Sequence, residues 1–377
     1  MSIIICGDLA PTSKNYKDFI DGTIFNIIDE NLFDLLNNDN FVVANLETPL
    51  TDNFTPIKKY GPNLIAPSKT VKGIKKMGVN LLSLSNNHIM DQGEIGLAST
   101  IKALQNNDIS YFGVGKKEEA SKPFFVNYNS KKICFYCCAE HEFSNATENE
   151  VGANSFDFFD TFDHIVDLRK QCDYLILLYH GGKEEYRYPS PRLKRVCQRM
   201  IDSGVNLVIC QHSHCIGCFE KYKHGNIVYG QGNFIFDYKN NEYWNTSILI
   251  KLDVNDNVDI SYIPLSVKNG KVSVAKDKEK EEILGAFNLR SESILKDGFV
   301  EEEYNCYCKE KLSEYIFAIS SPIYQSLFFR VINKLSNRLL QKIVTKHYLK
   351  YRRYSLINKL ECEAHNELLL FALKKYK

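Results

Sequence analysis

The chain has 377 residues, of which 44% are hydrophobic and 25% charged, a composition typical of globular proteins. Its 47 basic and 46 acidic side chains leave a net charge of +1, so overall charge indicates no nucleic-acid partner. The length exceeds that of most single domains and predicts one large domain with a smaller appendage. The N-terminal MSIIICGD lacks the features of a secretory signal, and no apolar run is long enough for a membrane span, so a cytoplasmic location is expected.

Between residue 1 and about residue 240, short apolar runs alternate with helical patterns, which is typical of strands joined by crossover helices. One of these helices should begin at Ser190-Pro191, where a capping serine precedes a proline at the first helical position. We therefore predict an α/β domain whose strands are buried on both faces. The predicted strands are 3–6, 41–46, 79–84, 133–137, 174–179 and 205–210.

The pattern changes beyond residue 226, where shorter strands of alternating hydrophobicity predict an antiparallel region. A polar, charge-dense stretch at 268–283 predicts a domain boundary near residue 283. Residues 284–377 should be mostly helical, and they are basic from residue 330 onward. Such a basic tail is more often the solvated face of packed helices, but it can also make peripheral contact with an anionic membrane or another polyanion.

The chain contains twelve cysteines, six of them in or next to strand-like runs, and most are predicted to be reduced thiols in the core. Cys215 and Cys218 have the spacing of half a zinc site or of a redox pair. The sequence has no second pair of matching spacing that could complete a four-sulfur site, so a structural role is favoured for both.

Polar groups that can bind metal or transfer protons follow five of the predicted strands. The carboxyl ends of neighbouring strands in an α/β sheet converge on one edge, so we expect these groups to meet in one pocket. The strongest single signal is the His-x-His pair at 212–214, because alternate residues of a strand point to the same side. The groups are Gly7-Asp8, Asn45-Leu46-Glu47, Asn86-Asn87-His88, His180-Gly181-Gly182 and Gln211-His212-Ser213-His214.

The candidate ligands combine imidazole, carboxylate and amide oxygen without a convincing cysteine. This mixture suits manganese, iron or zinc rather than calcium or a sulfur cluster. Six ligands are too many for one tetrahedral ion, and they suffice for two divalent metal ions that share a carboxylate. The candidates that follow apolar runs are the histidines His88, His180, His212 and His214 and the carboxylates Asp8 and Glu47, with asparagine amides beside them.

Six segments between residues 1 and 240, in their order and spacing, resemble the CapA family of poly-γ-glutamate capsule biosynthesis proteins, a branch of the calcineurin-like metallophosphoesterase superfamily. The segments are GDLAPT, NLETPLT, LSLSNNHIMDQGEIGL, YHGGKEEYRYP, VICQHSH and VYGQGNFIFD. The resemblance implies a two-sheet α/β/β/α sandwich over residues 1–283. It does not cover the helical C-terminal extension over residues 284–377.

The resemblance also implies how the ligands would divide between two ions. The first ion would be held by Asp8 and His214. The second would be held by Asn87, His180 and His212. Glu47 would bridge both ions.

His88 would, by the same resemblance, hydrogen-bond the scissile group or protonate the leaving oxygen. Asp91 would either orient His88 or cap the helix that follows. The implied chemistry is hydrolysis of a phosphate ester by in-line attack of water, with the ions offsetting charge on the phosphoryl oxygens. We therefore expect a phosphodiesterase or phosphatase in the synthesis of capsule or another cell-surface polymer, acting on a small or polymeric phosphorylated or polyanionic substrate.

Three positions depart from the superfamily pattern. Ala10 stands where the first motif has a histidine, Glu47 replaces the bridging aspartate, and Gln211 replaces a glycine before the His-x-His pair. The first metal site is therefore expected to be the weaker one. Two other functions stay open: a non-catalytic assembly component of polymer synthesis, and metal-assisted amide chemistry on a γ-linked glutamyl polymer.

Overall fold

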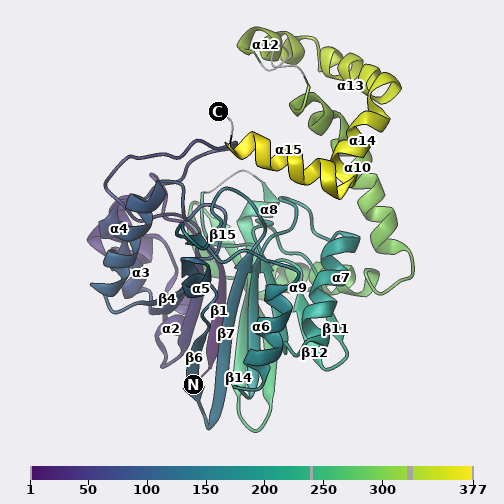
Figure 1. The fold of residues 1–377 in the computed structure, drawn as a ribbon. Coiled ribbons are helices and arrows are strands. Elements are labelled where there is room, and N and C mark those ends of the chain that lie inside the picture. Colours follow the sequence, from purple (N-terminus) through teal and green to yellow (C-terminus); the bar gives the residue numbers. More distant parts are fainter. Residues whose placement is uncertain (1, 238–240, 321–325, 376–377) are drawn as a thin grey trace. The chain divides into compact units, whose positions relative to one another are not determined.

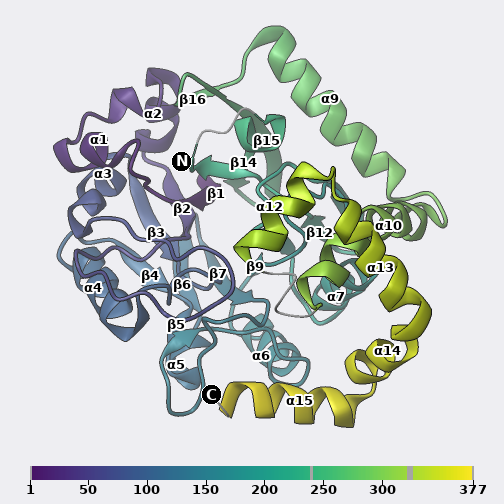
Figure 2. The same cartoon turned by 90° about the horizontal axis from the view of Figure 1, so that it is seen from above.

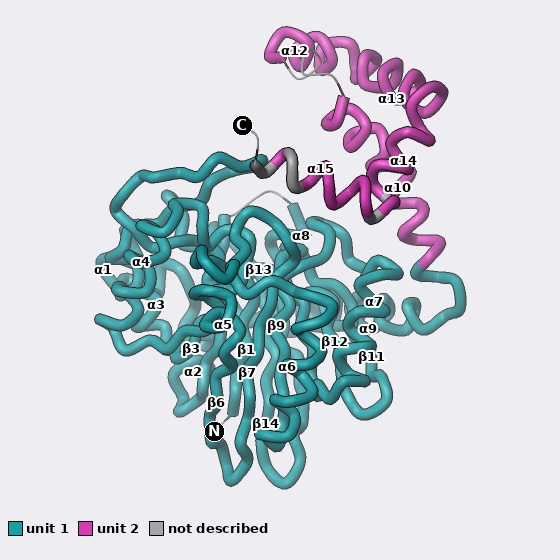
Figure 3. Tube along the Cα trace, viewed as in Figure 1, with its two compact units in different colours: residues 1–300 teal, residues 301–377 magenta. Residues whose placement is uncertain are grey.

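The computed structural model describes residues 2–237, 241–320 and 326–375 (Figure 1). These residues form two compact units that meet in sequence between Val300 and Glu301 (Figure 3). Lys377, counted in the basic tail, lies outside the described residues.

The first unit extends past the predicted boundary near residue 283 because helix α9 (Asp277–Ser293) packs against it. Phe287 of α9 is fully buried, and the Ser291 hydroxyl accepts a hydrogen bond of 2.8 Å from the backbone N–H of Phe219. The polar stretch at 268–283, which includes the start of α9, is therefore part of the first unit. The assignment of two functional domains stays a prediction.

The larger sheet of the first unit has the strand order β16-β15-β14-β1-β2-β3-β4, and β13 pairs with the end of β1. Strands β1 to β4 run parallel, whereas β14 to β16 are antiparallel, as the sequence pattern beyond residue 226 predicts. The strands are β1 (Ile3–Leu9), β2 (Phe41–Leu46), β3 (Val79–Ser83), β4 (Ser110–Phe112), β13 (Asn233–Ile235), β14 (Thr246–Val254), β15 (Val258–Lys268) and β16 (Lys271–Val274).

The second sheet has the order β11-β12-β10-β9-β7-β6, with parallel inner strands and antiparallel edges. Its strands are β6 (Phe124–Tyr128), β7 (Lys131–Ala139), β9 (Tyr174–His180), β10 (Leu207–Gln211), β11 (Phe219–Tyr222) and β12 (Gly225–Val228). A short two-stranded sheet joins β5 (Val114–Gly115) to β8 (Gly152–Ala153).

The two sheets pack face to face, and helices cover their outer faces (Figures 1 and 2). Alternation along β1 demonstrates the layering, because Ile3 and Ile5 join the apolar cluster between the sheets, whereas Ile4 and Cys6 join the cluster beneath the helices. The larger sheet is covered by α1 (Tyr16–Asp21), α2 (Glu30–Asn37), α3 (Val71–Lys76) and α4 (Gly93–Gln105). The second sheet is covered by α6 (Asp160–Arg169) and α7 (Pro191–Asp202). The predicted α/β/β/α sandwich is confirmed.

Helix α7 begins as its sequence predicts, since the Ser190 hydroxyl accepts a hydrogen bond of 3.1 Å from the Leu193 N–H. The first unit also contains the short helices α5 (Lys117–Ala120) and α8 (Glu242–Asn245). The second unit is helical, with α10 (Phe299–Ala318), α12 (Leu327–Leu335), α13 (Leu339–Tyr351), α14 (Arg353–Glu361) and α15 (Glu363–Lys375). Among the described residues, no helix has the length and apolar character needed to span a bilayer.

Candidate metal centre

The carboxyl ends of strands from both sheets meet at one edge of the sandwich. Asp8 lies near the end of β1, Glu47 directly follows β2, and His180 is the last residue of β9. In-register pairing places Asp8 beside Asn45 and His180 beside Gln211. All eight residues that the sequence singles out are buried at this edge: Asp8, Glu47, Asn87, His88, Asp91, His180, His212 and His214.

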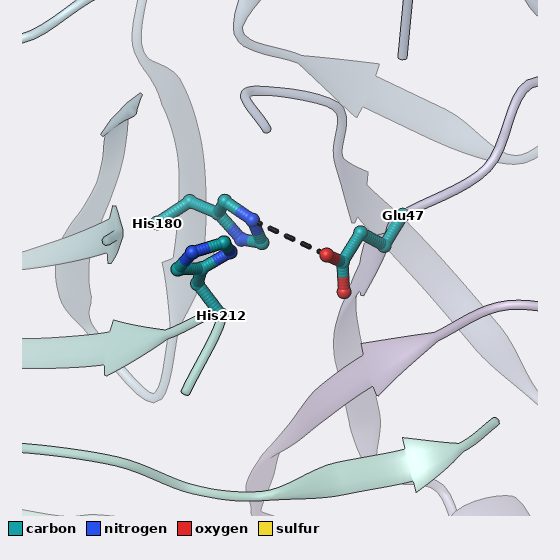
Figure 4. A group of neighbouring side chains, drawn as sticks. All are labelled: Glu47, His180 and His212. Carbon is teal, nitrogen blue, oxygen red and sulfur yellow. Dashed lines mark ion pairs between the residues drawn. The ribbon is translucent and has the colours of Figure 1, made fainter. Parts of the chain in front are cut away.

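Five of the buried side chains form two overlapping groups. Ligand atoms of Glu47, His180 and His212 all lie within 4.8 Å of one another (Figure 4). The same holds for Asp8, Glu47 and His214, so the Glu47 carboxylate belongs to both groups. The Asn87 amide oxygen lies 3.0 Å from Nε2 of His180, beside the first of these groups. The structure thus brings together the ligands as the resemblance divides them, and their roles as metal ligands stay a prediction.

The donor atoms of Glu47 and His212 fit a bound cation. Both carboxylate oxygens of Glu47 and Nδ1 of His212 are buried and have no hydrogen-bond partner among the described residues. Nε2 of His180 lies 3.4 Å from Oε1 of Glu47 (Figure 4). Burying such groups without a hydrogen bond still costs several kcal/mol, and a divalent ion would provide the missing interaction. Oxygen and imidazole nitrogen are also the donors that manganese, iron and zinc accept.

Burial shifts the protonation of this edge toward neutral forms. It raises the pKa of Asp8 to about 7, with Glu47 adding to the rise, and it raises the pKa of Glu47 to about 8. Burial lowers the pKa of His180, and it lowers the pKa of His212 well below its ordinary value. Since metal ligands must be deprotonated, protons compete with a cation for the two carboxylates, whereas the histidines are ready to coordinate.

Two asparagines hold the ligands in place. Asn45 donates a hydrogen bond of 2.8 Å to Oδ1 of Asp8 and lies 3.2 Å from Nδ1 of His180. Asn86 donates to the amide oxygen of Asn45 over 3.0 Å. The backbone N–H of His212 donates to the other Asp8 oxygen, also over 3.0 Å. Such outer contacts fix the orientation of metal ligands. Asn45 was predicted to lie among the polar groups at the strand ends, but its contacts with Asp8 and His180 were not predicted.

His88 lies beside the two ligand groups, and its imidazole is held by Asp91. Nδ1 of His88 is 2.6 Å from Oδ2 of Asp91 and 3.2 Å from the Lys59 ammonium. The alternative capping role of Asp91 is wrong, because the residue at the N-cap of α4 is Gln92, without a side-chain capping bond. Lys59 contacts Oδ1 of Asp91, and its side chain is only 2% exposed. Lys59 was not predicted as a site residue, because it lies in an irregular stretch without a periodic pattern.

His212 and His214 reach the site by a different backbone path from the predicted one. Strand β10 ends at Gln211, and both histidines have left-handed backbone angles, with φ of 83° and 52°. The argument from strand alternation is therefore wrong, although both imidazoles face the site. Positive φ is uncommon for residues other than glycine and often marks a functional turn. His214 is further fixed by Asn233, whose amide oxygen lies 2.8 Å from its Nδ1.

Two of the three positions that depart from the superfamily pattern, Gln211 and Ala10, are buried in the core. Gln211 donates to the Cys6 carbonyl and to the Gln231 side-chain oxygen, both over 3.2 Å, and so joins the two sheets below the site. Ala10 is buried and offers no ligand.

Cys215 and Cys218 are free, buried thiols whose pKa is raised by burial, which makes them poor nucleophiles.

The chain matches a protein-family model. The model described as "Bacterial capsule synthesis protein PGA_cap" matches residues 2–238, which is more than half of the chain and contains every candidate ligand.

Two similar curated proteins are both described as CapA. The capsule biosynthesis protein CapA of Bacillus anthracis is 26% identical over 298 residues, covering 74% of this chain and 71% of its own length. The PGA biosynthesis protein CapA of Bacillus subtilis (strain 168) is 28% identical over 204 residues, covering 52% of this chain and 53% of its own length.

Solved structures resemble the chain more distantly. A hypothetical protein from Thermus thermophilus aligns with a TM-score of 0.41 and 12% identity, over 73% of this chain and 96% of that one. A structure described as a novel phosphatase from Mycoplasma pneumoniae aligns with a TM-score of 0.41 and 13% identity, over 72% of this chain and 90% of that one.

Proposed function

Because the chain belongs to the PGA_cap family of bacterial capsule synthesis proteins, we propose that it is a metal-dependent hydrolase of phosphate esters, acting in the synthesis of capsule or another cell-surface polymer. The observation that carries this proposal is the Glu47 carboxylate. It belongs to two adjacent ligand groups, and neither of its oxygens has a hydrogen-bond partner in the described part of the chain. A carboxylate shared between two sites is what a two-ion centre requires.

The side chains around this carboxylate suit phosphoester hydrolysis. The ligands of the two ions would be those named above, and bound ions would supply Lewis acidity that polarises the phosphoryl oxygens and acidifies the attacking water. His88 is the candidate proton donor, because Asp91 holds its Nδ1 and leaves Nε2 available to a leaving oxygen. Asp91 thus acts through His88 as a positioning residue.

Elemental analysis of the purified protein, combined with hydrolysis of bis-p-nitrophenyl phosphate and p-nitrophenyl phosphate in added manganese, tests the proposal. We expect about two manganese, iron or zinc ions per chain, and loss of both metal and turnover in His212→Ala. His224→Ala, which removes an exposed histidine, is the matched control and should retain both. Wild-type protein that binds no divalent ion and turns over neither ester would refute the proposal.

A second candidate function is assembly of the synthesis machinery at a membrane, and the second unit favours it. Leu327, Phe328 and Leu335 of α12 are 67–82% exposed, next to basic residues such as Arg330 and Lys334. An apolar face with flanking cations suits an anionic bilayer surface. Leu327→Asp with Leu335→Asp should abolish cosedimentation with phosphatidylglycerol vesicles, and equal binding to phosphatidylcholine vesicles would contradict this candidate. The cytoplasmic location stays a prediction.

A further inference from the structure

A cavity of about 480 Å³ opens directly beside the candidate metal centre. His88 and His214 form part of its wall, so any molecule bound there would contact the candidate proton donor. Other parts of the wall come from the loop after β1 and from Pro62–Ile65. The cavity is large enough for the organic part of a phosphate ester whose phosphate lies at the ligand groups.

The cavity wall carries polar atoms that lack hydrogen-bond partners. Thr48 directly follows Glu47 and is only 1% exposed, yet its hydroxyl has no partner in the described chain. The side-chain oxygen of Asn63 and Oδ1 of Asp237 also have no hydrogen-bond donor among the described residues, although Oδ2 of Asp237 pairs with Lys14. An amide oxygen and a carboxylate oxygen can only accept, and a hydroxyl can accept as well as donate. A ligand that donates several hydrogen bonds would therefore be favoured in this cavity.

The charge of the wall disfavours an anionic ligand. Its charged side chains apart from the histidines are the carboxylates Glu184 and Asp237, and no lysine or arginine is among the described residues that line the cavity. Lys14 lies 3.6 Å from Oδ2 of Asp237, but this pair is largely exposed and contributes little. A second carboxylate or phosphate on the substrate would meet these two carboxylates, and the described lining offers it no lysine or arginine.

We propose that this cavity binds the leaving group of the substrate and that the leaving group is a neutral polyol, such as a sugar or a sugar alcohol. Polyol hydroxyls would donate to Thr48, Asn63 and Asp237. The inference rests on the proposed function for the position of the phosphate. The polyol assignment narrows the range of expected substrates, because the carboxylates that line the cavity disfavour a polyanionic glutamyl chain.

The chain has a single tryptophan, Trp244, which lines the cavity, so its intrinsic fluorescence reports binding there. The sharpest comparison uses sorbitol 6-phosphate and 6-phosphogluconate, which differ only in a terminal hydroxymethyl or carboxylate group. We expect zinc-loaded protein to bind sorbitol 6-phosphate at least about tenfold more tightly. Equal or tighter binding of 6-phosphogluconate would overturn the proposal, and tighter binding of ethanolamine phosphate would overturn the polyol assignment.

Thr48→Val tests the wall itself, because valine preserves the shape and removes the hydroxyl. The Kd for sorbitol 6-phosphate should rise about tenfold, while the Kd for inorganic phosphate and the metal content stay unchanged. If Thr48→Val weakened the binding of sorbitol 6-phosphate and of inorganic phosphate by the same factor, the proposal would be overturned. If the protein hydrolysed p-nitrophenyl phosphate but did not bind sorbitol 6-phosphate more tightly than 6-phosphogluconate, this inference would be overturned and the proposed function would stand. If it bound sorbitol 6-phosphate more tightly but hydrolysed no ester, the cavity assignment would be supported and the hydrolase proposal refuted.

Discussion

Replacing Glu47 with glutamine should stabilise the metal-free protein while removing its affinity for metal. Burial raises the Glu47 pKa from 4.5 to about 8, so the folded chain at pH 7 keeps a proton that the unfolded chain releases. Each pKa unit corresponds to about 1.4 kcal/mol, which makes this cost about 3 kcal/mol at pH 7. Glutamine avoids that cost but buries an unsatisfied amide, at about 1 kcal/mol. We therefore expect a net gain of about 2 kcal/mol in the free energy of unfolding.

Urea unfolding in EDTA at pH 7 and at pH 5 measures this gain. At pH 5 the advantage of glutamine should vanish, because protonating Glu47 then costs less than about 1 kcal/mol. Glu281→Gln makes the same chemical change at an exposed site of α9 and should change stability by less than about 0.5 kcal/mol. The reasoning is refuted if Glu47→Gln is no more stable than wild type at pH 7, or if its effect is the same at both pH values.

Three further predictions follow from particular contacts. The unfolding free energy of the metal-free protein should fall by about 2 kcal/mol between pH 6.5 and 8, because folded Asp8 and Glu47 retain protons that the unfolded chain has lost. Below pH 6.5 the buried, neutral histidines have the opposite effect, because the unfolded chain protonates them and the folded chain does not. Urea titrations in EDTA at a series of pH values measure this change. An unfolding free energy that stays constant or rises between pH 6.5 and 8 would contradict the prediction. Asp91→Asn should cost about 3 kcal/mol in the same assay by leaving the buried Lys59 ammonium without its carboxylate, and restoration by Lys59→Met would identify that cause. Gly7→Ala should cost at least about 2 kcal/mol in thermal unfolding, since its Cβ would lie 2.0 Å from the Gly232 carbonyl oxygen; an unchanged Tm would show that β1 and β13 can separate.

The positions of the candidate site residues were predictable from the sequence because each follows an apolar strand. Hydrophobic periodicity identifies strands locally, and the carboxyl ends of parallel strands meet at one edge whatever the details of packing. Asp8, Glu47 and His180 are found where this argument places them. The contact between Asp91 and His88 could also be predicted, since the two residues are only three positions apart in the sequence.

The contacts that tune the site were not predictable, because they join parts of the chain that only the sheet order brings together. Asp8 accepts a hydrogen bond from His212, and Lys59 reaches His88 from an irregular segment. The left-handed turns at His212 and His214 depend on packing around them rather than on local preference.

By itself, the amino-acid sequence of this protein determined the layered α/β class, the ligand types and the membership of a capsule synthesis family, because those properties reside in local patterns and short motifs. Only the tertiary structure decided that one carboxylate serves both ligand groups, that a lysine is buried behind the candidate proton donor, and that a cavity of unpaired acceptors adjoins the site. The physical reason is that burial, hydrogen bonding and charge at each of these atoms depend on neighbours far away in the chain.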